Sequence, residues 1–172
     1  PLRDILIQLA GTGLFQARWS AKIEQEFVGA LLRNRPDLDP AKLDRMCELM
    51  HIAVEDCLIE GYESLTDAMT MPAESDRHVV AAAIIGRADV IVTNNLKHFP
   101  AEHLPANIEA QSPDHFLRNL HDLSPYQLAE AVLAIRDRLV RNPRTIGEML
   151  ETYREQGLTE TAAALVGNEF LW

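Results

Sequence analysis

The hydrophobic pattern of the chain changes period inside residues 75–99. Small and apolar residues dominate from Val79 to Ile85 without alternation, which is typical of a helix buried on most of its surface, and Gly86 is placed to end it. Val90-Ile91-Val92 follows as an all-apolar, β-branched run. A strand of this kind, reached from a helix by a short turn, indicates a parallel sheet covered on both faces. The segment therefore predicts half of a βαβ unit.

Apolar residues at helical spacing predict further helices ahead of this segment. The expected ranges are 1–10, 20–32, 40–50 and a short one at 62–69. Ser20 is expected to cap the second of these helices and Asp39 the third, with Pro40 in its first turn. Short strands are expected at 14–19 and 54–59.

The second half of the chain turns from mixed to all-helical character. An edge strand is expected at 108–111 and a helix from Ser112, followed by helices at 124–140, 145–156 and 159–166. The sequence thus predicts an α/β domain over 1–123 without its opening strand, and a C-terminal helical extension over 124–172. The apolar tail, Phe170-Leu171-Trp172, either folds back onto the domain or marks an interface, and the first is favoured.

Polar residues stand at the two ends of the helix–strand unit that should be neighbours in space. Asp76 opens the helix, and Thr93-Asn94-Asn95 follow the strand. Chemistry in open parallel sheets gathers beside strand carboxyl ends and helix N-termini, so these residues are expected to face one crevice. Taken alone, Asp76 is explained equally well as a first-turn acid that the helix dipole stabilises, without any role in a site. Taken alone, Thr93-Asn94-Asn95 is better explained as an ordinary polar turn after a strand.

The run resembles the C-terminal half of a PIN-domain nuclease core, the fold of VapC-like toxins of toxin–antitoxin pairs. The family pattern has an acid opening a helix of small apolar residues, a hydrophobic strand, and a "V-T-x-(D/N)-x-x-x-F" ending. The matching positions here are Asp76, Ala81-Ala82-Ala83, Val90-Ile91-Val92, Thr93, Asn95 and Phe99. Because many PIN proteins carry Asp at the position of Asn95, a neutral amide replaces one potential metal carboxylate.

The resemblance also gives a role to an acid on the helix after Ser20. PIN proteins carry a site acid in the pattern "S-x-x-x-x-x-E-(L/F)", which matches Ser20 through Glu26-Phe27. Without the family, Glu26 reads as an exposed helical carboxylate. Glu24, on the same helix, is expected to be solvated.

The family's fold and chemistry follow from the resemblance as expectations. They are a PIN-like three-layer sandwich with a central parallel sheet, and metal-dependent endoribonuclease activity on RNA. Glu26 and Asp76 would bind Mg²⁺ or Mn²⁺, while Thr93 and Asn95 would hold a ligand, a water or a phosphate oxygen. A cognate antitoxin and a homodimer are the expected protein partners. PIN cores open with a hydrophobic strand ending in Asp, which the given sequence does not include. If the parent protein has this strand, the chain is expected to be a fragment of a metal-dependent ribonuclease; if it does not, little activity is expected.

Composition adds few constraints. The chain has 172 residues, 47% of them hydrophobic and 24% charged, which is ordinary for a globular protein. It contains neither an apolar run long enough to span a membrane nor a signal-peptide pattern, so a cytoplasmic location is expected. Cys47 and Cys57 lack the spacing of a disulfide framework or a zinc site. The histidines show no metal-ligand spacing and are expected at the surface or at helix caps, with His78 the one nearest the crevice.

The formal net charge of −10 argues against nucleic-acid binding over the whole surface, because phosphate contacts need Lys and Arg. A polyanion would have to approach over local cations. The candidates are Arg3, Arg18, Lys22, Arg33, Arg35, Arg77, Arg87 and Lys97.

Three hypotheses follow. The first is a metal-dependent endoribonuclease of VapC-like toxin type. The second is a catalytically incomplete PIN-like module that binds RNA or a protein partner. The third is an interaction domain whose C-terminal helices are the working surface.

Overall fold

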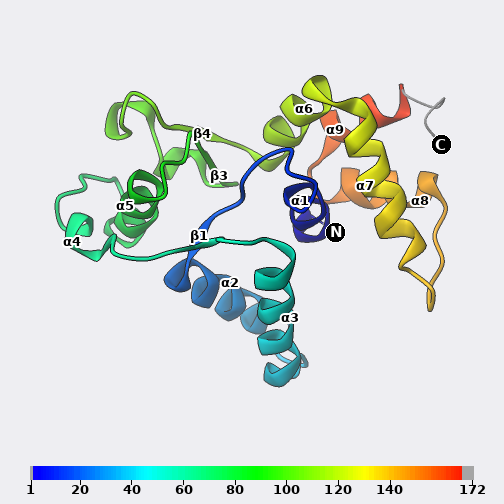
Figure 1. Ribbon diagram of the computed structural model, residues 1–172, viewed down its shortest axis with the longest axis horizontal. Helices are drawn as coiled ribbons and strands as arrows, with labels where there is room; N and C mark the ends of the chain where they lie inside the picture. The colour runs from blue at the N-terminus through cyan, green and yellow to red at the C-terminus, as the bar shows by residue number, and fades with distance from the viewer. Residues whose placement is uncertain (1, 168–172) are drawn as a thin grey trace. The chain divides into compact units, whose positions relative to one another are not determined.

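The computed structural model describes residues 2–167, and Figure 1 shows their helices and strands. Of these residues, those up to Phe15, Val92–Asn94 and those from Gln111 onward form one compact unit, the helical unit. Gln16–Ile91 and Asn95–Ala110 form the other, the α/β unit. The predicted division into 1–123 and 124–172 follows chain order, whereas the helical unit joins the first helix to the last four. That division stays a prediction, and Phe170-Leu171-Trp172 lie outside the described residues.

The helices of the helical unit begin and end close to where the sequence predicts. They are α1 (Leu2–Ala10), α6 (Pro113–Leu123), α7 (Pro125–Asp137), α8 (Ile146–Glu155) and α9 (Thr159–Val166). Side-chain caps explain several of these starts. The Ser112 hydroxyl accepts the His115 N–H at 3.1 Å, and Thr145 and Glu148 form the reciprocal capping box that their spacing predicts.

The core of the helical unit joins α1 to the C-terminal helices. Ile5 and Leu9 are fully buried in one apolar cluster with residues of α6, α7, α8 and α9. Phe15, just beyond α1, meets Phe116 of α6 edge to face, with ring centroids 5.0 Å apart. Figure 1 shows α1 beside α6 and α7. The C-terminal helices therefore pack against the start of the chain.

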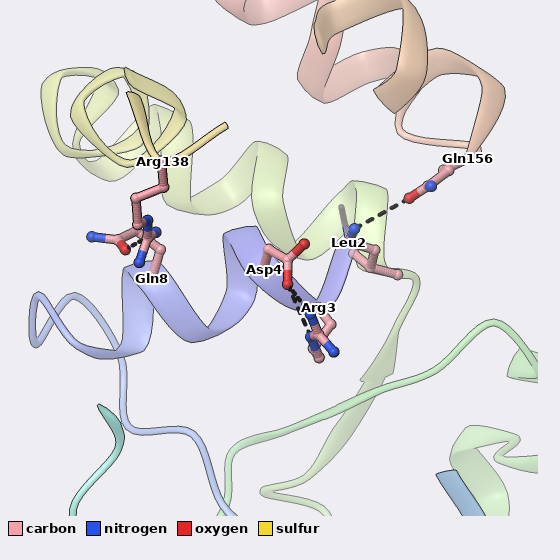
Figure 2. Close-up of polar contacts among 6 residues, drawn as sticks. All are labelled: Leu2, Arg3, Asp4, Gln8, Arg138 and Gln156. Atoms are coloured by element: carbon pink, nitrogen blue, oxygen red, sulfur yellow. Dashed lines mark hydrogen bonds and ion pairs between the residues drawn. The ribbon is translucent and has the colours of Figure 1, made fainter. Parts of the chain in front are cut away.

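Polar contacts fix both ends of α1 in this unit, as Figure 2 shows. The Leu2 N–H donates to Gln156 Oε1 at 3.1 Å, and the Arg138 guanidinium donates to Gln8 Oε1 at 2.5 Å. Arg3 and Asp4 pair with each other on the same helix. Residues more than 100 positions apart thus set the position of α1.

The N-terminus of α9 is capped from another helix. Asp114 of α6 accepts the backbone N–H groups of Glu160 and Thr161, each at 2.9 Å, and the Thr161 hydroxyl at 2.7 Å. Burial alone would raise the pKa of Asp114, but the hydrogen bonds from Thr161, Glu160 and Thr159 outweigh it and hold that pKa below its usual value.

The α/β unit contains most of the strands and the candidate acids. Its elements are β1 (Trp19–Ser20), α2 (Ala21–Asn34), α3 (Pro40–Ala53), β2 (Leu58–Ile59), α4 (Glu63–Thr66), η1 (Glu74–Asp76), α5 (Arg77–Ile85), η2 (Leu96–His98) and η3 (Ala101–His103). β3 (Val90–Val92) and β4 (Glu109–Gln111) complete the strands among the described residues. As predicted, Asp39 caps α3 by accepting the Ala41 N–H at 3.0 Å, and Cys47 is buried on α3.

The described strands form two pairs. β1 and β2 are parallel, with Trp19 opposite Leu58 and Ser20 opposite Ile59. β3 pairs with β4 in a separate two-stranded sheet. The fold is therefore α/β with small sheets and a helical C-terminal part, and the PIN-like sandwich with one central sheet stays a prediction.

Both early strands are shorter than predicted. Residues 14–18 and 54–57 are not strands, and only the last residues of each predicted range pair. The apolar residues of these stretches bury against neighbouring helices instead: Phe15 packs on α6, and Val54 ends α3 with its N–H bonded to Met50 O. Burial in a turn or at a helix end gives the same hydrophobic pattern as burial in a short strand.

Close packing surrounds α5, as its small residues predict. Val80, Ala81 and Ala82 are at most 1% exposed. Gly86 ends the helix with φ −72°, so it is not needed for a left-handed turn; that conformation belongs to Arg87, with φ 52°. A larger residue at position 86 would be crowded, because a Cβ would lie 2.6 Å from Ile59 Cδ1 and 3.1 Å from the Ala82 carbonyl oxygen, and the end of the Ile59 side chain would have to shift.

Replacing Asp114 with alanine is expected to lower the free energy of unfolding of the helical unit by about 1–2 kcal/mol, the cost of losing an N-cap. Because the folded-state pKa of Asp114 is depressed, its contribution is present above the unfolded-state pKa of about 3.9 and is lost as pH falls through the folded value. Urea unfolding followed by circular dichroism at several pH values measures both. Asp122→Ala removes an exposed acid from the same helix and is the control; an equal loss in both variants would contradict the cap.

Gly86→Ala is expected to destabilise the α/β unit by about 1–3 kcal/mol, because the new methyl group overpacks against Ile59 and the Ala82 carbonyl. Adding Ile59→Val, which removes Cδ1, should recover part of the loss. Thermal unfolding of the single and double variants measures this. Gly29→Ala, with its nearest atom at 3.4 Å in the flexible Arg33 side chain, should instead be neutral or stabilising. Equal melting temperatures for Gly86→Ala and the parent would rule out the packing constraint.

Candidate functional site

The start of α2 is fixed by a buried cap at the end of β1. Ser20 is fully buried, and its hydroxyl accepts the Ile23 N–H at 3.3 Å, as the sequence predicts. Because β1 runs directly into α2, the first turns of α2 begin where the β1–β2 pair ends. Lys22, Glu24 and Glu26 all lie in these turns.

Glu26 turns toward the first turn of α5. Its Oε1 lies 3.1 Å from Nε2 of His78, a histidine that is only 1% exposed, while the Glu26 side chain is 53% exposed. The expectation of a surface or capping histidine is therefore wrong for His78, which is buried beside Glu26, one of the two candidate acids. A buried imidazole next to an accessible carboxylate gives the end of α5 a polar, water-facing edge.

Asp76 occupies the N-cap position of α5, yet its side chain makes no capping hydrogen bond. Its Oδ2 instead lies 2.8 Å from Nδ1 of His98, in the short helix η2. The side chain is 22% exposed. Its interaction partner is thus a histidine far along the chain and not the N–H groups of the helix that it precedes.

Burial is the largest influence on His78 and lowers the pKa of its imidazole. Lys22 acts in the same direction, while Glu26 and Asp76 oppose it. The imidazole therefore favours its neutral form. These influences also show which charges surround the ring: one ammonium and the two candidate carboxylates.

The two candidate acids thus meet the same end of α5 from different elements. Asp76 is its cap residue, and Glu26 of α2 contacts His78, two positions further on. Asn95 precedes η2, and its carbonyl oxygen accepts the His98 N–H at 2.9 Å, which supports the turn that carries the partner of Asp76. Thr93 belongs to the helical unit, where its N–H donates to Gln111 O at 2.9 Å. Side-chain roles for Thr93 and Asn95 stay predictions.

Glu24 is not solvated as the sequence predicts. Its side chain is 18% exposed, and Oε2 accepts the Trp19 indole N–H at 3.0 Å and lies 2.6 Å from Nε2 of His51. The expectation of full solvation is wrong because Trp19 and His51, from β1 and α3, both present nitrogen atoms to this face of α2. The spacing of residues 19, 24 and 51 in the sequence does not predict these contacts. The one sequence feature that suggests a polar partner is the indole N–H of Trp19, which usually forms a hydrogen bond when the ring is buried.

The donor chemistry at the start of α5 suits a hard divalent cation. Glu26 and Asp76 offer carboxylate oxygens, and Mg²⁺ is commonly held by one or two carboxylates with several waters. Both carboxylates now lie within ion-pair distance of a histidine, and residues 2–167 contain no group of three or more His, Cys, Asp or Glu that could hold a metal. The set fits a largely hydrated Mg²⁺ or Mn²⁺ and does not fit a closed, all-protein metal centre. Within the same residues, no helix is long and apolar enough to cross a membrane.

Comparison with known proteins finds similarity in the C-terminal helices. Residues 113–167, which run from α6 to α9, match the family model of the VapC50 C-terminal domain. These helices carry no catalytic motif, and their family could not be read from their apolar spacing.

A curated relative is similar over a longer stretch. Over 97 residues the chain is 42% identical to "Putative ribonuclease VapC50" of Mycobacterium tuberculosis, which covers 56% of this chain and 57% of the relative. The chain therefore spans somewhat more than half the length of that protein. No solved structure matches the chain. Both similarities are to proteins described as VapC50, and they agree with the resemblance stated for the residues around Asp76.

Proposed function

We propose that the protein containing this chain is a metal-dependent endoribonuclease of VapC-like toxin type, which hydrolyses RNA phosphodiester bonds. One observation carries the proposal: Glu26 contacts His78 at the start of α5, two positions after Asp76, so carboxylates from α2 and η1 approach one helix end. The relative described as a ribonuclease supports the reaction class.

In this proposal Glu26 and Asp76 hold Mg²⁺ or Mn²⁺ together with waters. A bound divalent cation supplies an activated water and neutralises charge developing on the phosphodiester. The chain's own residues position the donors: His98 orients Asp76 at 2.8 Å, and the Glu26 carboxylate lies 3.1 Å from His78 beside the same helix end. Thr93 and Asn95 are proposed to hold a ligand, a water or a phosphate oxygen.

The remaining family properties belong to the same proposal. RNA is the substrate, a cognate antitoxin is the protein partner, and the protein forms a homodimer. The full core is a PIN-like three-layer sandwich, and the protein is cytoplasmic. The relative described as a ribonuclease supports RNA as the substrate. The antitoxin, the homodimer, the sandwich fold and the location rest on the family resemblance alone.

A second candidate function is a PIN-like module that binds RNA or a protein without cutting. Two observations favour it. The described residues contain no group of three or more His, Cys, Asp or Glu that could hold a metal, and by the family resemblance Asn95 stands where many PIN proteins carry Asp. RNA binding that survives EDTA, with no cleavage in Mg²⁺ or Mn²⁺ by the full encoded protein, would establish this candidate over the first.

Asp76→Asn and Glu26→Gln are each expected to lower the rate of RNA cleavage by at least about 100-fold, more than the 10–100-fold typical of residues that only orient a metal ligand. Each substitution keeps the shape of the side chain and removes a charge that a divalent cation needs. The measurement is cleavage of a labelled RNA by the full encoded protein, titrated with Mn²⁺.

Glu74→Gln is the matched control. Glu74 lies in η1 two positions before Asp76 and is 82% exposed, with its carboxylate paired to Arg77. Its loss should leave cleavage within about twofold, because exposed pairs of this kind contribute little. Unchanged cleavage in Asp76→Asn would remove Asp76 from the site.

A further inference from the structure

Lys22 is a cation without an ionic partner beside the candidate acids. It lies in the first turn of α2, is exposed, and precedes Glu26 by four positions. At this spacing on a helix, lysine and glutamate ordinarily pair. Here the Glu26 carboxylate lies 3.1 Å from His78 instead, and Lys22 has no ion pair within residues 2–167.

Many of the chain's other cations are already neutralised. Within the described residues, acids pair with Arg3, Arg35, Arg45, Arg77, Arg118, Arg136 and Arg154. The chain as a whole carries a net charge of −10. An RNA strand approaching two carboxylates is therefore repelled unless an unpaired cation stands close to them.

Lys22 lies next to the site by its place on α2. It is one helical turn before Glu26, whose carboxylate lies 3.1 Å from His78 in the first turn of α5. A long flexible stem on an exposed helix turn lets this ammonium reach an anion at the edge of the site.

We propose that Lys22 binds a backbone phosphate of the RNA and positions the strand beside Glu26 and Asp76. The identity of the polyanion rests on the proposed function, whereas the phosphate contact is testable without cleavage. Lys22 is a positioning residue: it holds the strand by charge and reads no base.

The test uses Lys22→Gln, with Lys42→Gln as the matched control. Lys42, in the first turn of α3, is also exposed and without an ion pair among the described residues, but no candidate acid lies four positions after it. Binding of a short fluorescein-labelled single-stranded RNA is measured by fluorescence anisotropy in EDTA, over a series of salt concentrations. EDTA removes divalent metal ions, so the RNA remains intact.

Lys22→Gln should weaken binding and make the slope of log K against log salt shallower by about 0.7, the value for one phosphate contact on a single strand. Lys42→Gln should leave the slope unchanged, and Lys22→Arg should restore it. In the cleavage assay, Lys22→Gln should raise KM more than it lowers kcat.

An unchanged slope in Lys22→Gln, an equal change in Lys42→Gln, or no RNA binding by the parent protein would overturn the proposal. The proposed function fails separately. RNA that binds through Lys22 but is never cut would support the Lys22 contact and contradict the proposed nuclease activity. Cleavage of RNA together with an unchanged salt slope in Lys22→Gln would support the nuclease activity and contradict the Lys22 contact.

Discussion

The candidate site depends on how tightly α5 is packed. Val80, Ala81 and Ala82 of this helix are buried, and a Cβ at position 86, just past its end, would lie 2.6 Å from Ile59 Cδ1 of β2. A helix held in this way cannot rotate or slide by a residue without a clash, since cores respond to changes as small as one methylene group. The position of His78 in the first turn is fixed by the same packing. The fixed backbone of α5 therefore decides where Glu26 and Asp76 can meet.

Pairing with histidines gives the two acids a defined geometry in the absence of other ligands. Two carboxylates at one helix end repel each other, and each here has an imidazole as neighbour, His78 for Glu26 and His98 for Asp76. Partners of this kind hold a side chain in one rotamer, which is the usual work of groups that surround metal ligands. The arrangement is consistent with acids kept ready for a cation, and also with a binding module that has no metal. The positions of the two acids are the same in both cases, so only an assay of metal binding or RNA cleavage distinguishes the nuclease from the binding module.

Local signals in the sequence predicted most of the helices. Ser20, Asp39 and Thr145 cap helices as their spacing indicated, because capping involves residues only two or three positions apart. The ranges 14–18 and 54–57 failed as strands because short apolar runs bury equally well in turns and at helix ends. In the site, Asp76 was predicted from its place at the start of the helix, and the role of Glu26 came from the family resemblance. The partners His78 and His98, and the Glu24 contacts, are long-range and have no signature in spacing.

The burial of α1 shows that the C-terminal helices do not make a complete core from their own residues. Ile5 and Leu9 are fully buried among side chains of α6 to α9, the segment that matches the VapC50 C-terminal domain. Removing two such residues from a core ordinarily costs several kcal/mol, a large share of the stability of a domain this small. The segment 113–167 therefore needs apolar residues from elsewhere, and in this chain α1 supplies them. Since α1 precedes the α/β unit in sequence, the helical unit is built from two stretches of the chain that are far apart in sequence.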